Sequence, residues 1–296
     1  MADREEAGSA DAAGSGAEGR KSGVRTIVIT GASDGIGAVA ARALAGPDVQ
    51  LVLVGRSAAK LAPIAADAGA IALTADYANL DEVRLLAEQV REQVGSIDVL
   101  LNNAGGTFDP GKRTVDGREP NFQINHLGGF LLTNLLRDRL AADGGALVLN
   151  TSSVANLWGS VDLDDLDWTR RRVVEMRAYG TSKLENILFT RGIAKRWADD
   201  GIVSAAVHPG AVSTSFGRDS FLIGLLYRTP LKRFGTITPE KGADPLIALA
   251  ERGADSSLNG VYFSRFQADG RENSQAAEPE LIDGLWERSV ELTGLG

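Results

Sequence analysis

The sequence predicts a doubly wound α/β fold, a three-layer sandwich in which helices cover both faces of a seven-stranded parallel sheet. From residue 24 onward, short runs rich in Val, Ile and Leu alternate with helical patterns, as in βαβ units. Most of these runs are continuously apolar, which is typical of strands that are buried on both faces. The first run leads directly into a glycine-rich turn and then a helix. We therefore expect a single α/β domain over residues 24–296.

Seven apolar runs are the candidate strands. In chain order they are Arg25 to Thr30, Gln50 to Val54, Ala70 to Leu73, Val99 to Asn102, Ala146 to Thr151, Val203 to Val207 and Val261 to Ser264. The segment before them, residues 1–23, has Met1 as its one apolar residue larger than alanine. Such a segment cannot bury enough apolar surface to offset its ordering entropy, so we expect a disordered tail.

Composition narrows the function classes. The net charge of −8 argues against a nucleic-acid partner, because such proteins need a clustered basic face. With no cysteine and two histidines, disulfides and thiolate sites are excluded and no metal site is expected. No apolar run reaches the roughly 18 to 20 residues of a membrane span. We expect a cytoplasmic protein with a small-molecule partner, and the oligomeric state stays open, a homo-oligomer included.

The turn after the first predicted strand reads TGASDGIG over residues 30–37. Glycines allow the backbone to approach a pyrophosphate closely, and the start of the next helix offers free N–H groups and a partial positive charge. The spacing G-x-x-x-G-x-G differs from G-x-G-x-x-G and from the Walker phosphate loop. Taken alone, the motif could also be a tight βα turn without a ligand.

A second group of polar residues indicates acid–base chemistry. Tyr179 and Lys183 are four residues apart in a long helical pattern, so they share one face. A nearby cation stabilises a phenolate and allows proton exchange near neutral pH. A Y-x-x-x-K pair alone is more often a packed tyrosine beside a solvated lysine. Here Asn125 and the segment NTSS over residues 150–153 accompany the pair and favour a catalytic interpretation.

Together these motifs resemble the short-chain dehydrogenase/reductase family in its single-domain form. The TGxxxGxG turn, NNAG over residues 102–105, the Y-x-x-x-K pair and Pro209-Gly210 follow one another in the family's order. The resemblance covers about residues 24–296. It implies a Rossmann-type fold and an NAD(P)-dependent oxidoreductase that moves a hydride between nicotinamide and a carbonyl or alcohol.

The resemblance also implies residue roles. Tyr179 would be the acid–base group, Lys183 would stabilise its ionised form, Ser153 would hold the substrate oxygen and Asn125 would orient a water on the proton path. The implied cofactor-binding residues are Gly31, Ser33, Gly35, Ile36, Gly37, Arg56, Asp76, Asn103, Ala104, Gly105, Tyr179, Lys183, Pro209, Gly210 and Thr214.

Cofactor choice is predicted from the end of the second strand. NAD-selective enzymes commonly place an acidic residue there to hold the ribose 2′-hydroxyl. Gly55 takes that place by the family resemblance, and Arg56 follows it with a fork of donors suited to a 2′-phosphate. Solvation of a strand end by Arg56 is the alternative, and Asp34 stands where some NADP enzymes carry a second basic group. We expect NADP(H) over NAD(H).

Two further segments resemble the retinol-dehydrogenase-like branch of the family. Ser153 and Tyr179 are 26 positions apart, and the insertion between them contains DLDDLDW over residues 162–168. The helix continues as SKLENILFT over residues 182–190. This branch implies a lipophilic ketone, aldehyde or alcohol as substrate, and we favour the ketoreductase direction.

The segment over about residues 212–236 occupies the family's substrate-loop position. Its apolar run FLIGLLY, residues 221–227, is expected to form a lid over a lipophilic substrate. A shallow membrane contact, or packing on the core or in a subunit interface, are the alternatives.

Two alternatives to a reductase remain. A non-catalytic NAD(P)-sensing protein would not need Asn125, Ser153, Tyr179 and Lys183 together. A sugar-nucleotide epimerase or dehydratase is disfavoured by the glycine spacing.

Overall fold

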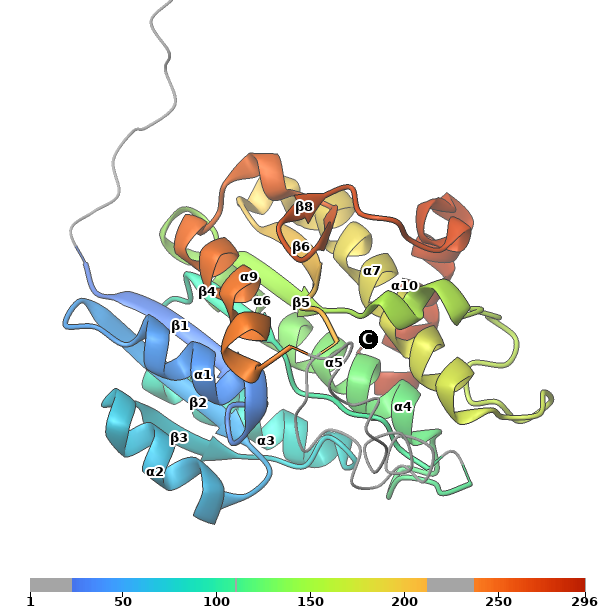
Figure 1. Ribbon diagram of the computed structural model, residues 1–296, viewed down its shortest axis with the longest axis horizontal. Helices are drawn as coiled ribbons and strands as arrows, with labels where there is room; N and C mark the ends of the chain where they lie inside the picture. Colours follow the sequence, from blue (N-terminus) through green and yellow to red (C-terminus); the bar gives the residue numbers. More distant parts are fainter. Residues whose placement is uncertain (1–22, 110, 212–236, 296) are drawn as a thin grey trace, which may run out of the picture.

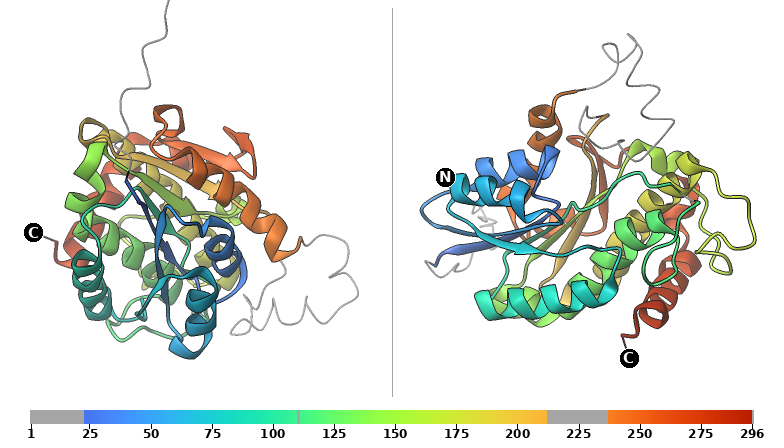
Figure 2. Two further views of the ribbon diagram at one scale, coloured as in Figure 1. Left: turned by 90° about the vertical axis from the view of Figure 1, so that its left-hand side faces the viewer. Right: turned by 90° about the horizontal axis from the view of Figure 1, so that it is seen from below.

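The computed structural model describes residues 23–109, 111–211 and 237–295. It shows one twisted sheet between two layers of helices (Figures 1 and 2). The predicted tail, apart from residue 23, and the predicted substrate loop over 212–236 lie outside the described residues.

All seven predicted strands are present and parallel, and they pair in the order β3-β2-β1-β4-β5-β6-β7. Their bounds are β1 (Arg25–Thr30), β2 (Val49–Gly55), β3 (Ile71–Thr74), β4 (Val99–Asn102), β5 (Leu147–Thr151), β6 (Val203–His208) and β7 (Val261–Ser264). An eighth strand, β8 (Gln267–Ala268), runs antiparallel to β7 and was not predicted, because two exposed residues carry no periodic pattern. The strand order reverses between β1 and β4, and ligands of doubly wound sheets bind at such a point.

Helices cover both faces of the sheet. Within the described residues the α-helices are α1 (Gly35–Leu44), α2 (Ala58–Ala68), α3 (Leu80–Gln93), α4 (Pro120–Phe122), α5 (Gly128–Leu135), α6 (Arg137–Ala141), α7 (Glu175–Trp197), α9 (Pro239–Arg252) and α10 (Pro279–Thr293). A π-helix, η1, covers Gln123–Leu127, and the short 3-10 helices are Ala142–Gly144, Val154–Trp158 (η3), Ala198–Asp200, Ser256–Leu258 and Ser274–Ala277. Among the described residues, no helix combines the length and the apolar character that crossing a membrane requires.

The core is divided by the sheet into two main apolar layers. Ile27 and Ile29 of β1 pack in the layer with α1, α2 and α9, while Val28 between them packs in the layer with α3, α5 and α7. This alternation follows from the period of two along a strand, and it explains why both faces of β1 are apolar. Because β1, β4, β5 and β6 are parallel, their carboxyl ends lie at the same edge of the sheet. The predicted motifs follow these strand ends.

Candidate active site

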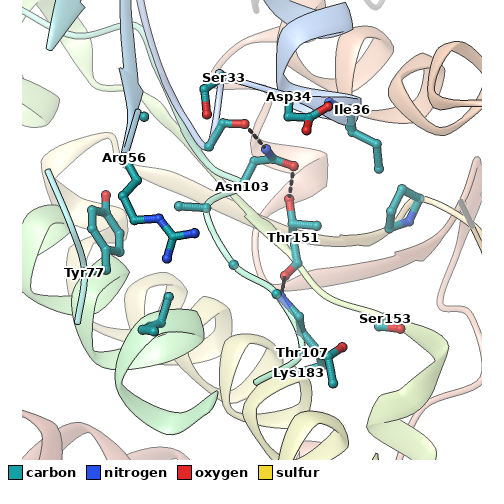
Figure 3. Close-up of a pocket in the computed structure, with 18 of the residues that line it drawn as sticks. Ser33, Asp34, Ile36, Arg56, Tyr77, Asn103, Thr107, Thr151, Ser153 and Lys183 are labelled. Atoms are coloured by element: carbon teal, nitrogen blue, oxygen red, sulfur yellow. Dashed lines mark hydrogen bonds between the residues drawn. The ribbon is translucent and has the colours of Figure 1, made fainter. Parts of the chain in front are cut away.

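A cleft of about 620 Å³ lies at this edge of the sheet. Its walls include most of the predicted site residues, namely Gly31, Ser33, Gly35, Ile36, Arg56, Asp76, Asn103, Ala104, Gly105, Ser153, Tyr179, Lys183, Pro209 and Gly210. Gly37 and Asn125 do not line it, and Thr214 lies outside the described residues. Figure 3 shows Ser33, Asp34 and Ile36 at one end of this pocket and Ser153 and Lys183 at the other.

The glycine-rich turn leaves room for a ligand at the start of α1. Gly31 has a φ of +67°, and a Cβ on it would lie 2.8 Å from the Ala104 Cα. A Cβ on Gly37 would lie 2.3 Å from the Gly31 carbonyl oxygen, so Gly37 supports the turn from behind. Asp34 caps α1 by accepting a hydrogen bond from the Gly35 N–H at 2.8 Å. The cradle and the exposed helix start fit a pyrophosphate group.

The NNAG segment is tied to β1 by side-chain bonds. The Thr30 hydroxyl accepts from the backbone N–H groups of Asn103 and Ala104, both at 3.0 Å. The Asn103 amide donates to the Thr30 carbonyl at 3.1 Å. Asn103 therefore holds the loop in place, while the backbone of Ala104 and Gly105 forms the wall of the cleft.

Tyr179 and Lys183 lie in the first turns of α7 and are almost fully buried, with exposed fractions of 7% and 3%. The Lys183 Nζ lies 5.7 Å from the centre of the Tyr179 ring and donates to the Thr151 carbonyl at 3.2 Å. Burial lowers the pKa of Lys183 to about 8. A cation at this distance favours the ionised form of the phenol.

Asn125 clamps the loop that follows NNAG. Its amide donates to the Gly106 carbonyl and to the Ser182 hydroxyl, both at 2.9 Å, and its Oδ1 accepts from the Gly106 N–H at 2.8 Å. A Cβ on Gly105 would lie 2.6 Å from that Oδ1, so a glycine is needed there. In the described structure Asn125 thus positions the loop beside Lys183.

The two serines after β5 make different hydrogen bonds. Ser152 donates to the Lys183 carbonyl at 2.7 Å and anchors α7 to the sheet. Ser153 caps η3 by accepting from the Ala155 N–H at 3.2 Å, and it lines the cleft. Its own hydroxyl proton is therefore able to point to a ligand.

The other end of the cleft carries two cations. Arg56 is exposed and lines the cleft, and a Cβ on Gly55 would lie 2.9 Å from the Ser33 Cβ, so an acidic side chain at residue 55 would collide with Ser33. Lys60 of α2, which was not predicted from the sequence, also lines the cleft and pairs with Asp34 at 3.6 Å. Its place in the first turn of the helix that follows the second strand was the available signal.

Behind the face of α7 that carries Tyr179 and Lys183 lies a buried carboxyl group, Glu185, with an exposed fraction of 1%. Neither of its oxygens has a hydrogen-bond partner among the described residues. Burial, and secondarily the charge of Glu119, raise the pKa of Glu185 well above its ordinary value of 4.5. Burial therefore favours the protonated form of this side chain in the folded protein.

This burial leads to a pH-dependent prediction for Glu185→Gln. A raised folded pKa makes the wild type lose stability as the pH rises above 4.5, because the folded protein retains a proton that the unfolded chain releases. We expect the variant to unfold at a higher temperature than the wild type at pH 7 to 8, with the difference vanishing near pH 4. Thermal unfolding across this range checks it, and the exposed Glu92→Gln is the control. A constant difference at every pH would contradict the interpretation.

Comparisons with known proteins identify similar chains. The sequence profile of the family described as short chain dehydrogenase matches residues 25–221. A protein of Streptomyces sp. (strain C5) that is named a daunorubicin C-13 ketoreductase is 41% identical, with 91% of this chain and 93% of the relative covered. Retinol dehydrogenase 13 of Homo sapiens is 35% identical over 92% of this chain and 85% of its own length. A solved short-chain dehydrogenase from Sphingobium yanoikuyae in complex with NADPH is similar with a TM-score of 0.60 and 25% identity, over 77% of this chain and 85% of that one.

Proposed function

The chain belongs to the short-chain dehydrogenase family, and from this premise we propose that it is an NADP(H)-dependent ketoreductase of lipophilic carbonyl compounds. It is an NAD(P)-dependent oxidoreductase that acts on CH–OH or carbonyl groups, in the retinol-dehydrogenase-like branch of its family. The cofactor preference, the substrate class, the reductive direction and a cytoplasmic location are the proposed part. The observation that carries the proposal is that one cleft is lined by the glycine cradle at one end and by Ser153, Tyr179 and Lys183 at the other.

The residues of the cleft fit a nicotinamide dinucleotide. The cradle of Gly31, Gly35 and Ile36 would hold the pyrophosphate, and Ala104, Gly105, Pro209 and Gly210 would border the ring. When bound, the cofactor supplies the hydride for a carbonyl or accepts it from an alcohol. Asp76 is partly exposed at the adenine side of the cleft, where its Oδ1 accepts from the Ala78 N–H at 3.0 Å.

Residues of the chain itself would supply the proton that the substrate oxygen takes up during reduction. Ser153 would hold the substrate oxygen beside the Tyr179 hydroxyl, and Tyr179 would donate a proton to it during reduction. Lys183 would favour the phenolate that is left, because a cation stabilises the charged form. Asn125 would keep the loop of Gly106 in place and, in our proposal, also orients a water that returns the proton to the site.

Two cationic side chains, and the absence of an acidic residue at the end of the second strand, support NADP(H) as the cofactor. Arg56 and Lys60 line the same end of the cleft, and residue 55 has no room for a carboxylate. The negative charge of Asp34 counted against a preference for NADP(H), and the ion pair of Asp34 with Lys60 offsets that charge. The Sphingobium yanoikuyae relative was solved with NADPH.

Cofactor preference is tested with Arg56→Ala. A charge-assisted bond to a 2′-phosphate contributes about 1.5 to 3 kcal/mol, so its loss should weaken NADPH binding roughly tenfold or more relative to NADH. Lys60→Ala should act in the same direction, and the exposed Arg42→Ala, outside the cleft, should change neither affinity. The affinities of both cofactors are measured by titration for each variant. A wild type that prefers NADH would overturn this part of the proposal.

Apolar residues border the cleft at the end where Ser153 and Lys183 lie. Phe108 and Val154 line it, and Trp158 follows in the same 3-10 helix as Val154 with an exposed fraction of 59%. An apolar border favours a substrate with an apolar body, since burying such surface releases about 25 cal/mol per Å². The names of the two curated relatives, a ketoreductase and a retinol dehydrogenase, support the same substrate class.

A panel of carbonyl compounds tests the proposed function. NADPH oxidation is followed with aromatic ketones, quinones, long-chain aldehydes and small water-soluble ketones. We expect kcat/KM to be highest for the bulky apolar compounds. Cofactor binding without turnover of any compound, in either direction, would indicate the sensing protein instead.

A further inference from the structure

A second, small cavity lies behind the cleft, between the central strands and the helical layer of α5 and α7. It is bordered by Thr30, Asn102 and Asn150 at the ends of β1, β4 and β5, and by Asn125, His126 and Gly129 from the helical side. About 10 Å³ is open to the centre of a water molecule. This volume is close to the smallest that holds one water.

Three polar atoms border this cavity without a hydrogen-bond partner among the described residues. They are the Tyr77 Oη, the Asn102 Oδ1 and the His126 Nδ1, and all three residues are buried. Buried polar groups in folded proteins are almost always hydrogen-bonded to protein or to ordered water. Three unpaired groups around one cavity therefore call for a shared partner.

The side chains next to these three atoms leave them without a hydrogen bond of acceptable geometry. The Thr30 hydroxyl, next to Tyr77, already donates to the Leu101 carbonyl at 3.2 Å and accepts two backbone N–H groups. The Asn102 amide donates to Thr133 at 2.8 Å and to Asn150 at 3.0 Å, which fixes its Oδ1 toward the cavity side. The Thr30 hydroxyl therefore has no bond to spare for Tyr77, and Asn186, beside His126, makes no hydrogen bond of acceptable length and angle to the His126 Nδ1.

His126 is held in one orientation with its Nδ1 unpaired. Its ring stacks on Phe122 at 5.8 Å and meets the edge of Phe189 at 5.9 Å, while its Nε2 lies 3.0 Å from the Ser289 hydroxyl. Burial lowers the pKa of His126 to about 3, so the ring is neutral, with one nitrogen a donor and the other an acceptor.

We propose that this cavity is an internal water-binding site, in which one ordered water bridges Tyr77, Asn102 and His126. The hydrogen bonds balance for either histidine tautomer, because the water donates to Asn102, accepts from Tyr77, and donates to or accepts from His126. Its place matters for the active site, since His126 directly follows Asn125 in η1. The water would fasten this π-helix to β4 from the side opposite the cleft, and so position Asn125.

Two substitutions test the site through the sign of their effect on stability. If the cavity were dry, Tyr77→Phe would remove an unpaired hydroxyl and raise the unfolding temperature. With a bound water it removes a hydrogen bond, and we expect a decrease of a few degrees. The control Tyr262→Phe removes a known bond, from the Asn156 amide at 3.2 Å, and calibrates that decrease. An increase for Tyr77→Phe would overturn the proposal.

Gly129→Ala places a methyl group beside the proposed water. Its Cβ would lie 3.6 Å from the Asn102 Cγ and 3.7 Å from the Asn102 Oδ1, which are ordinary contacts. Gly→Ala inside a helix normally stabilises a protein, and filling a dry cavity would add to this gain. Because the methyl would displace the water and leave three polar groups unpaired, we expect no gain or a decrease. A clear increase would contradict the water site.

A crystal structure of the wild-type protein that resolves ordered water decides the matter directly, even if a variant fails to fold. We expect one density peak within hydrogen-bond distance of the Tyr77 Oη, the Asn102 Oδ1 and the His126 Nδ1. An empty cavity, or a peak that lies within hydrogen-bond distance of only one of the three atoms, would overturn the proposal.

Discussion

Replacing Tyr179 by phenylalanine is expected to lower turnover by about 10²- to 10⁴-fold, the usual contribution of a positioned acid–base group. The substitution removes one hydroxyl from a buried ring and little packing, so NADPH affinity and folding should be nearly unchanged. Steady-state turnover of a ketone substrate, together with NADPH titration, measures both quantities on one preparation.

Tyr262→Phe is the matched control for this substitution. Tyr262 is also buried and its hydroxyl accepts from Asn156, but it does not line the cleft. We expect this control to cost about 1 kcal/mol of stability and to leave turnover within a few-fold of the wild type. Turnover of Tyr179→Phe within that same few-fold range would remove Tyr179 from its catalytic role.

Lys183→Met is expected to lower turnover by about 10²-fold or more and to weaken NADPH binding as well, because the ammonium favours the phenolate and, by family resemblance, contacts the nicotinamide ribose. The same substitution is expected to raise the stability of the folded protein. Burial lowers the pKa of Lys183 to about 8 from 10.5, so holding the charge in the folded protein costs free energy in full below pH 8. The variant removes that cost, and its gain in unfolding temperature should shrink as the pH rises from 8 toward 10.5.

Lys195→Met provides the control on the same helix. Lys195 is exposed at the far end of α7, where it pairs with Asp283 at 2.8 Å, and its loss should change neither turnover nor cofactor affinity. A Lys183→Met variant with lower turnover but unchanged NADPH affinity would remove the ribose contact from the account. A variant less stable than the wild type at pH 7 would contradict the stated cost of the buried charge.

The parts of the fold that repeat a periodic pattern were predictable from the sequence. Strands such as Arg25–Thr30 and Val99–Asn102 coincide with the predicted runs because both faces of a central strand must be apolar. The motifs at the strand ends were readable for a related reason, since the glycines of the first turn have no room for a Cβ. The short edge strand β8 offers no such pattern and was missed.

Contacts between distant segments of the chain were not predictable in this way. Lys60 reaches the cleft only because α2 folds back along β2, and the two carboxamide bonds of Asn125 to Gly106 depend on the path of a loop. Asn125 was predicted to orient a water, and the described structure adds a clamp on the loop that the sequence alone could not reveal. The cavity between Tyr77, Asn102 and His126 likewise arises where three separate segments meet.

The central claim, hydride transfer from NADPH to a carbonyl carbon, is tested most directly by isotope transfer. The wild-type protein is incubated with an aromatic ketone and NADPH that carries one deuterium at nicotinamide C4. Two separate runs use cofactors labelled on one face of C4 or on the other. We predict an alcohol with one deuterium at the carbinol carbon from one of the two labelled cofactors, formed in equal amount to the NADPH consumed. An alcohol without deuterium from either cofactor, or NADPH consumption without alcohol, would contradict the account.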